Sequence, residues 1–150
     1  MSTEVRIDAL LPAEMARRAE YLGVRKAEMP ALKVFTLAIL AGAFIALGAI
    51  FATTIWSGGM TIKGADGVAF STGLPYGVTR LLGGVAFCVG LILVVIGGAE
   101  LFTGNNMIVM AWASRKITSK ALLRNWGIVY LGNFVGSIGT AVMLLVSKQY

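Results

Sequence analysis

The sequence predicts an all-α membrane protein with three transmembrane helices, the second of which is broken. Mean hydropathy is +0.82 and only 13% of the 150 residues are charged, against about 25% in soluble proteins. Val34 to Trp56 and Leu81 to Ala99 contain no charged residue. A glycine-rich polar string at 97–106 then interrupts the second apolar stretch before it resumes.

Each apolar run predicts one transmembrane span. Residues 34–56 are long enough to cross a hydrocarbon core of about 30 Å. The second span covers 81–113 and is broken near 98–105, and the third covers 125–147. Between the first two, residues 57–80 are rich in glycine and predict an extramembrane loop. Together, residues 34–150 form the expected transmembrane unit.

Residues 1–33 are polar and amphipathic, and we expect them to lie on the cytoplasmic side. Apolar residues recur there at near-helical spacing. Pro12 fits the first turn of a helix, which we expect to run to about Leu22 and to end at Gly23.

The polar string inside the second span is the candidate functional region. Its break-forming residues are Gly98, Glu100, Gly104 and Asn105. Such groups are costly at membrane depth unless they line a polar path or pack inside a bundle. Two apolar half-segments around a glycine-rich break are typical of a substrate path in a transporter or channel.

The third span carries closely spaced small residues, Gly132, Gly136 and Gly139. They fall near one helix face and predict close helix packing, within or between protomers. Asn133 could hydrogen-bond across helices or face a pore, and the packing role is the favoured one. Cys88 is expected to be a small packed apolar residue.

Charge predicts the orientation in the membrane. Ten lysines and arginines lie before the first span or between the second and third, and three lie on the other side. The positive-inside rule therefore places the N-terminus and residues 114–124 in the cytoplasm. These basic residues flank apolar spans, so nucleic acid is not an expected partner.

Composition also argues against several site types. The chain has no histidine and a single cysteine, which disfavours a zinc or haem site. No nucleophile–base pair of the usual kind can be assembled without histidine. We therefore expect no metal, no cofactor and no enzymatic activity.

Four strings carry a family resemblance: residues 10–15 with Gly23-Val24, residues 83–87, residues 98–104, and residues 125–126 with 130–136. They resemble the formate/nitrite transporter family, and its formate-channel branch most closely. Gly-Ala-Glu-Leu-Phe-Thr-Gly at 98–104 and Gly-Asn-Phe-Val-Gly at 132–136 are specific together.

The resemblance implies a homopentamer in the bacterial inner membrane, with small monovalent anions such as formate or nitrite, or their neutral acids, as cargo. Each aquaporin-like protomer would hold its own pore and consist of two inverted three-helix repeats. On that pattern Phe87 and Leu91 match the outer apolar constriction, and Leu101 and Thr103 match the inner one. The amphipathic helix near residues 10–22 matches a segment that helps to gate the cytoplasmic side.

The chain departs from the family pattern in length. Its 150 residues cover one repeat, whereas the family's second repeat supplies three more helices, a pore histidine and a lysine near the pore entrance. Either the sequence is part of a longer protein, or it is a half-protein that needs two copies in opposite orientation. The charge asymmetry disfavours the second option, so we expect a longer parent protein and no specific flux from this half alone.

Two other functions are open from the sequence. The chain could be a small membrane subunit that packs against a larger complex, but such a subunit has no use for a polar break. It could also be a proton-coupled antiporter that uses Glu100 as its carrier. The favoured interpretation gives Glu100 a structural role, because a carboxylate would repel an anion: it would accept hydrogen bonds from loop amides or pair with a basic loop residue. The sequence does not decide whether the Thr103 hydroxyl lines the path or is packed against other residues.

Overall fold

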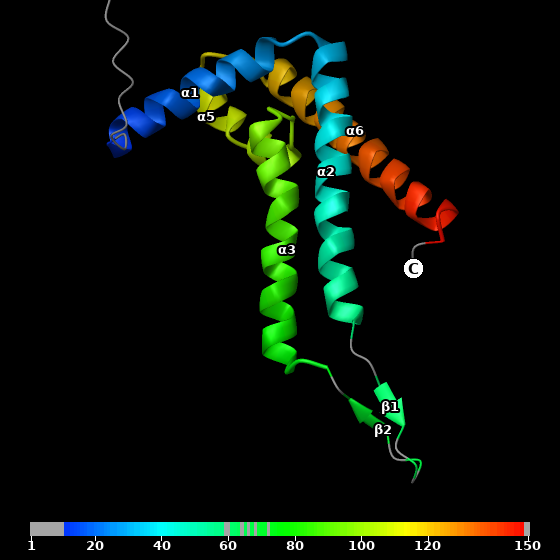
Figure 1. Ribbon diagram of the computed structural model, residues 1–150. Helices are drawn as coiled ribbons and strands as arrows, with labels where there is room; N and C mark the ends of the chain where they lie inside the picture. The colour runs from blue at the N-terminus through cyan, green and yellow to red at the C-terminus, as the bar shows by residue number, and fades with distance from the viewer. Residues whose placement is uncertain are drawn as a thin grey trace, which may run out of the picture.

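Three long apolar helices dominate the structure, a computed structural model that describes residues 11–58, 61–63, 65, 67, 69–71 and 73–148. They are α2 (Ala31–Ser57), α3 (Tyr76–Ile96) and α6 (Ser119–Val146), and each is long and apolar enough to cross a membrane. Helices α2 and α3 run side by side, whereas α6 crosses α2 at an angle and diverges from it (Figure 1). The predicted three membrane helices are confirmed.

The helices extend beyond the apolar runs that predicted them. Helix α6 begins at Ser119, six residues before the expected start, because the Thr118 hydroxyl caps it by accepting from the Ala121 amide at 3.2 Å. Lys120 and Arg124 are therefore helical and not in a loop. Helix α3 likewise begins at Tyr76, so it includes Arg80. For α6, a side-chain cap and not the hydrophobic run marks where the helix starts.

Helix α1 (Pro12–Glu28) lies across the end of the other helices, nearly perpendicular to α2 in the view of Figure 1. The expected stop at Gly23 is wrong, because the helix continues through it for five more residues. Gly23 is buried, and a Cβ there would lie 3.1 Å from the Cβ of Ala111. The glycine permits close contact with α5 (Ile108–Ala113) instead of ending the helix. Residues 1–10 of the expected cytoplasmic segment lie outside the described residues.

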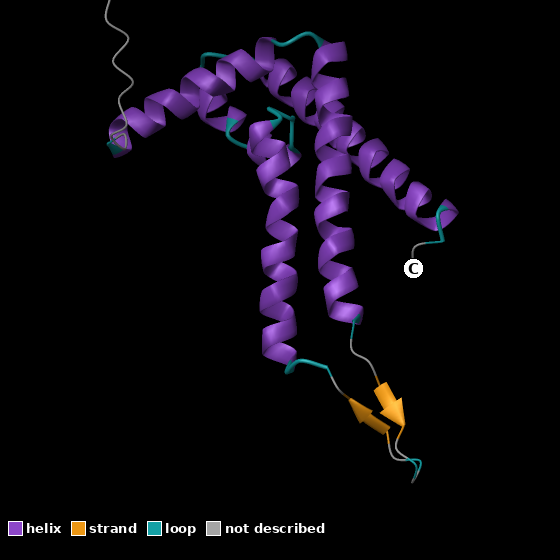
Figure 2. Cartoon of the chain, in the orientation of Figure 1, coloured by secondary structure: helices purple, strands orange, loops and turns teal. Residues whose placement is uncertain are grey.

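The expected loop between the first two membrane helices contains a short hairpin. Strands β1 (Thr61–Lys63) and β2 (Ala69–Ser71) pair antiparallel within the loop that follows α2 (Figure 2). Gly67, between the strands, has a φ of +78°, a conformation that glycine adopts without strain.

The predicted break in the second span is confirmed. Helix α3 ends at Ile96, residues 97–101 are not helical, and the chain then forms the single turn α4 (Phe102–Asn105) before α5. Gly98 reaches a φ of +60° in this segment. The change of direction at this point needs a glycine for that reason.

Small residues bring α6 against α2. A Cβ added to Gly132 would lie 2.5 Å from that of Ala38, and one at Gly136 would collide with the Ile39 carbonyl. The predicted packing glycines are thus explained at these two positions. Gly139 is exposed, and a Cβ there would meet no atom of the described structure within 4 Å. The contact with α2 does not extend to Gly139, because α6 diverges from α2 (Figure 1). Packing of Gly139 between protomers stays a prediction.

Candidate functional site: the break in the second span

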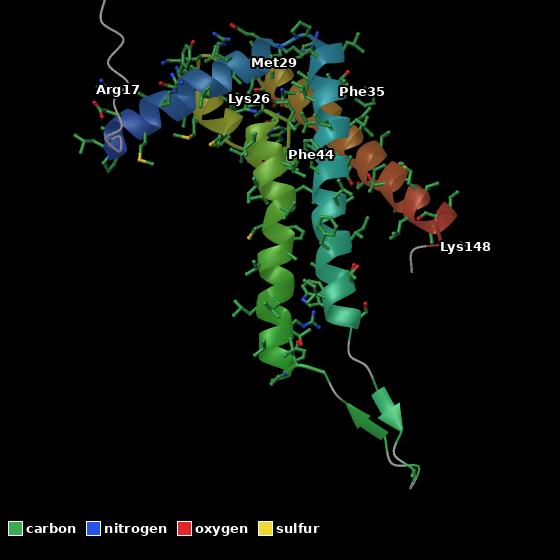
Figure 3. The ribbon with its side chains drawn as sticks, viewed as in Figure 1. Arg17, Lys26, Met29, Phe35, Phe44 and Lys148 are labelled. Carbon is green, nitrogen blue, oxygen red and sulfur yellow. The ribbon has the colours of Figure 1, made fainter. Side chains whose placement is uncertain are left out.

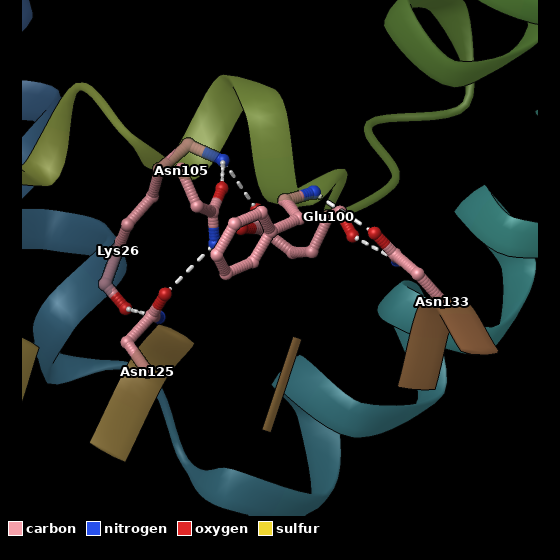
Figure 4. Close-up of polar contacts among 6 residues, drawn as sticks. Lys26, Glu100, Asn105, Asn125 and Asn133 are labelled. Carbon is pink, nitrogen blue, oxygen red and sulfur yellow. Dashed lines mark hydrogen bonds and ion pairs between the residues drawn. The ribbon is translucent and has the colours of Figure 1, made fainter. Parts of the chain in front are cut away.

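The break is anchored by a buried ion pair. Glu100 is 4% exposed, and its Oε1 accepts from the Nζ of Lys26 at 2.7 Å. The predicted structural pairing of Glu100 is present, but its partner comes from α1 and not from a loop. Burying a charge is costly unless an opposite charge and hydrogen bonds compensate it, so this contact ties the break to α1 (Figure 4).

Two buried asparagines extend the ion pair into a closed network. Asn105 accepts from Lys26 Nζ at 3.0 Å and donates to Asn125 Oδ1 at 2.9 Å. Asn125 then donates to the Lys26 carbonyl at 3.0 Å. Both asparagines are essentially inaccessible to solvent, at 0% and 1% exposed. The network joins α1, α4 and α6 (Figure 4).

The Asn133 side chain bonds the backbone of the break and also the backbone of α2. Its Nδ2 donates to the carbonyls of Ala38 and Glu100 at 2.8 and 2.9 Å, and its Oδ1 accepts from the Phe102 amide at 2.9 Å. Both N–H groups and the oxygen of this side chain therefore bond to other segments of the chain, and Figure 4 shows its contact with Glu100. The structure shows the cross-helix role that we favoured from the sequence.

A second ion pair fixes α1 farther along its length. Glu20 Oε2 lies 2.7 Å from Lys116 Nζ, in the segment between α5 and α6. Hydrogen bonds from Lys116 and Ser114 hold the pKa of Glu20 below its usual range. Helix α1 is thus held at both Glu20 and Lys26, and the labelled Lys26 faces the break while Arg17 lies toward the far end of α1 (Figure 3).

The four expected constriction residues differ in environment. Phe87 is half-buried and Leu91, one helical turn later, is 48% exposed. Leu101 is half-buried and packs on the cluster of Ala41, Val94 and Ala99. Thr103 is exposed.

The structure explains the need for glycine at one of the two remaining glycines of the break. Gly98 has the positive φ noted above, and Gly104 is half-buried in α4 with no atom of the described structure within 4 Å of an added Cβ. Cys88 is exposed on α3, so the expectation of a packed cysteine is wrong.

Sequence reasoning missed three contributors to this site. Lys26 was considered only as a charge that sets the topology. Asn125 and Trp126 were considered only as the start of a span and as part of a family string. The Trp126 indole donates to the Asn105 carbonyl at 3.0 Å. Polar side chains near an apolar span were the available signal, but their partners are 20 to 99 residues away.

Residues 13–150 match the family model described as formate/nitrite transporter. The chain belongs to the formate/nitrite transporter family. It is 41% identical to the formate channel FocA of Escherichia coli over 150 residues, which is all of this chain and 48% of that protein. It is 39% identical to FocA of Haemophilus influenzae over 94% of this chain and 45% of that protein.

Solved structures agree with this membership. A pentameric formate channel with formate bound matches at a TM-score of 0.65 and 47% identity, over 79% of this chain and 42% of that one. The chain spans about half the length of the curated relatives it matches. The family consists of membrane transporters, and the relatives named here are channels, not enzymes.

Proposed function

We propose that this chain supplies half of a membrane channel for formate and similar small monovalent anions such as nitrite. The break between α3 and α5 carries the proposal: a polar network holds a non-helical turn inside an otherwise apolar span. Irregular backbone at membrane depth is tolerated where it is buried or lines a path. The relatives named as formate channels support formate as the cargo.

The proposed path passes Phe87, Leu91, Leu101 and Thr103. A formate ion would lose much of its hydration in an apolar constriction, at a cost of several kcal/mol. The neutral acid avoids most of that cost. The exposed Thr103 hydroxyl can donate to an oxyanion and rotate away. Leu101 is held in place by its packing on the α2–α3 core.

The proposed assembly is a homopentamer in the bacterial inner membrane, with a second repeat completing each pore. Placing α1 in the cytoplasm follows from the positive-inside rule. The Glu20–Lys116 contact supports it, because it brings the two basic segments, α1 and residues 114–124, to one end of the molecule.

The paired state of Glu100 argues against the antiporter alternative. A proton carrier must change partners during transport, whereas Glu100 is buried and bonded to Lys26. No observation favours a packing subunit over a channel.

Formate uptake tests the proposal. The protein encoded by the complete reading frame is reconstituted into liposomes, and carbon-14 formate uptake is measured against empty liposomes at several pH values. Saturable uptake of formate, and its exclusion of larger carboxylates, is the expected result. Uptake equal to that of empty liposomes would refute a channel for this cargo.

A further inference from the structure

Arg80 lies between two aromatic rings at the end of the α2–α3 pair that is away from α1. Its guanidinium carbon is 4.7 Å from the ring centroid of Trp56 and 5.0 Å from that of Tyr76. Trp56 is in the last turn of α2 and Tyr76 in the first turn of α3. Both contacts are within cation–π range, so the rings restrict where the guanidinium can lie.

This arrangement leaves the binding edge of the guanidinium available. Arg80 is exposed, and guanidinium N–H groups match a carboxylate bidentately. Among the described residues, both ion pairs involve other cations, Lys26 and Lys116. Arg80 also borders a hollow of about 390 Å³, together with Trp56, Tyr76 and Thr79.

The position of Arg80 on its helix relates it to the proposed path. Phe87 and Leu91 follow it by seven and eleven residues on the same continuous helix. At 3.6 residues per turn, these three side chains fall within about 20° of one direction. With a rise of about 1.5 Å per residue, Arg80 stands about 10 Å from Phe87 along the axis.

We propose that Arg80 forms a carboxylate-binding site at the channel mouth away from α1. It would bind formate through paired N–H bonds and deliver it to the constriction below. This inference rests on the proposed function, since it takes Phe87 and Leu91 as lining the path. A phosphate of a lipid headgroup has similar oxyanion chemistry, and aromatic residues are common at the membrane interface. The helical alignment with Phe87 and Leu91 favours formate.

Uptake kinetics test the site. Arg80→Gln removes the positive charge and the paired N–H donors of the guanidinium, whereas Arg80→Lys keeps only the charge. Lys148→Gln is a charge-matched control at an exposed residue just after α6. The full protein is reconstituted in liposomes of known orientation, with and without anionic lipid. Formate is applied from the Arg80 side.

We expect Arg80→Gln to raise the half-saturating formate concentration about three- to ten-fold, the scale of one charged hydrogen bond at an exposed site. The maximal rate should be unchanged because the constriction is intact. The half-saturating concentration of Arg80→Lys should lie between those of the wild type and Arg80→Gln, and that of Lys148→Gln should equal the wild-type value.

Binding is also measured without transport, as line broadening of carbon-13 formate by the purified protein. Weaker line broadening with Arg80→Gln than with the wild type supports the site, whether or not the wild type transports formate. Absence of wild-type flux would refute the proposed function and leave this inference standing. Wild-type flux with an unchanged half-saturating concentration in Arg80→Gln would overturn the inference alone. An effect of Arg80→Gln that appears only with anionic lipid would also overturn it, and would assign the site to a lipid phosphate.

Discussion

The carboxylate of Glu100 lies 2.7 Å from the ammonium of Lys26, a residue 74 positions earlier in the chain. Together with the bond from Lys26 to Asn105, this contact (Figure 4) links the break in the second span to α1, the helix that lies across one end of the molecule (Figure 1). Any movement of α1 away from the break would leave Glu100 buried without its charge partner. The position of α1 and the conformation of the break are therefore coupled.

Lys26→Met tests this coupling. It should destabilise the protein by about 3 kcal/mol, the scale expected when one partner of a buried ion pair is removed. Thermal unfolding in detergent measures the loss, and limited proteolysis shows whether α1 is released. Lys26→Met combined with Glu100→Gln should recover part of the stability, because no charge is left unpaired. Equal stability of the single variant and the wild type would contradict the coupling.

Asn133→Ala should also destabilise the break. It leaves the Glu100 carbonyl and the Phe102 amide, both in or beside the non-helical segment, without their partner, at about 1–3 kcal/mol for each buried group left unsatisfied. Formate flux should fall together with the stability, because the break loses its hydrogen bonds to Asn133. Ser137→Ala is the matched control, because that hydroxyl bonds to the carbonyl of Asn133 within its own helix. A similar unfolding temperature for both variants would argue against the role of Asn133.

The glycines of α6 should separate into two classes. Gly132→Ala and Gly136→Ala place a methyl group against α2 and should cost about 1–3 kcal/mol or more through overpacking. Gly139→Ala should be neutral or slightly stabilising within the protomer, because alanine favours the helix and the space is open. Unfolding temperatures of the three variants check this order. Destabilisation by Gly139→Ala would instead indicate a contact between protomers.

Leu91→Ala and Thr103→Val should change flux in opposite directions. The first removes about three carbons from the proposed constriction, so it should speed permeation of formate and weaken selection against larger anions. The second keeps the shape but loses the hydroxyl, so it should slow formate without widening the path. Uptake into proteoliposomes at several pH values compares them. Identical flux in both variants and the wild type would place the pore elsewhere.

Docking of α1 should weaken in acid. The pKa of Glu20 is held below its usual value of 4.5 by Lys116 and Ser114, so the ionised form is favoured in the docked state. The contribution is present above pH 4.5 and is lost as the pH falls through the lowered pKa. Hydrogen exchange of the α1 backbone amides as a function of pH measures this loss of docking. Glu20→Gln should remove this part of the pH dependence, and an unchanged profile would show that Glu20 does not contribute.

The sequence by itself determined the three apolar helices and the break, because both depend on local composition. Uncharged runs of membrane length and a glycine-rich polar string are visible without any tertiary information. The helix ends were harder to predict. Gly23 indicates a helix end in the sequence, yet it lies inside α1, where it permits close contact with Ala111.

Only the tertiary structure decided how the break is held. The partners of Glu100, Asn105 and Asn133 come from α1, α2 and α6, and no local pattern pairs residues that far apart. The same holds for Gly139, whose spacing matches that of Gly132 and Gly136. The helices cross at an angle, so the contact ends before the glycine pattern does.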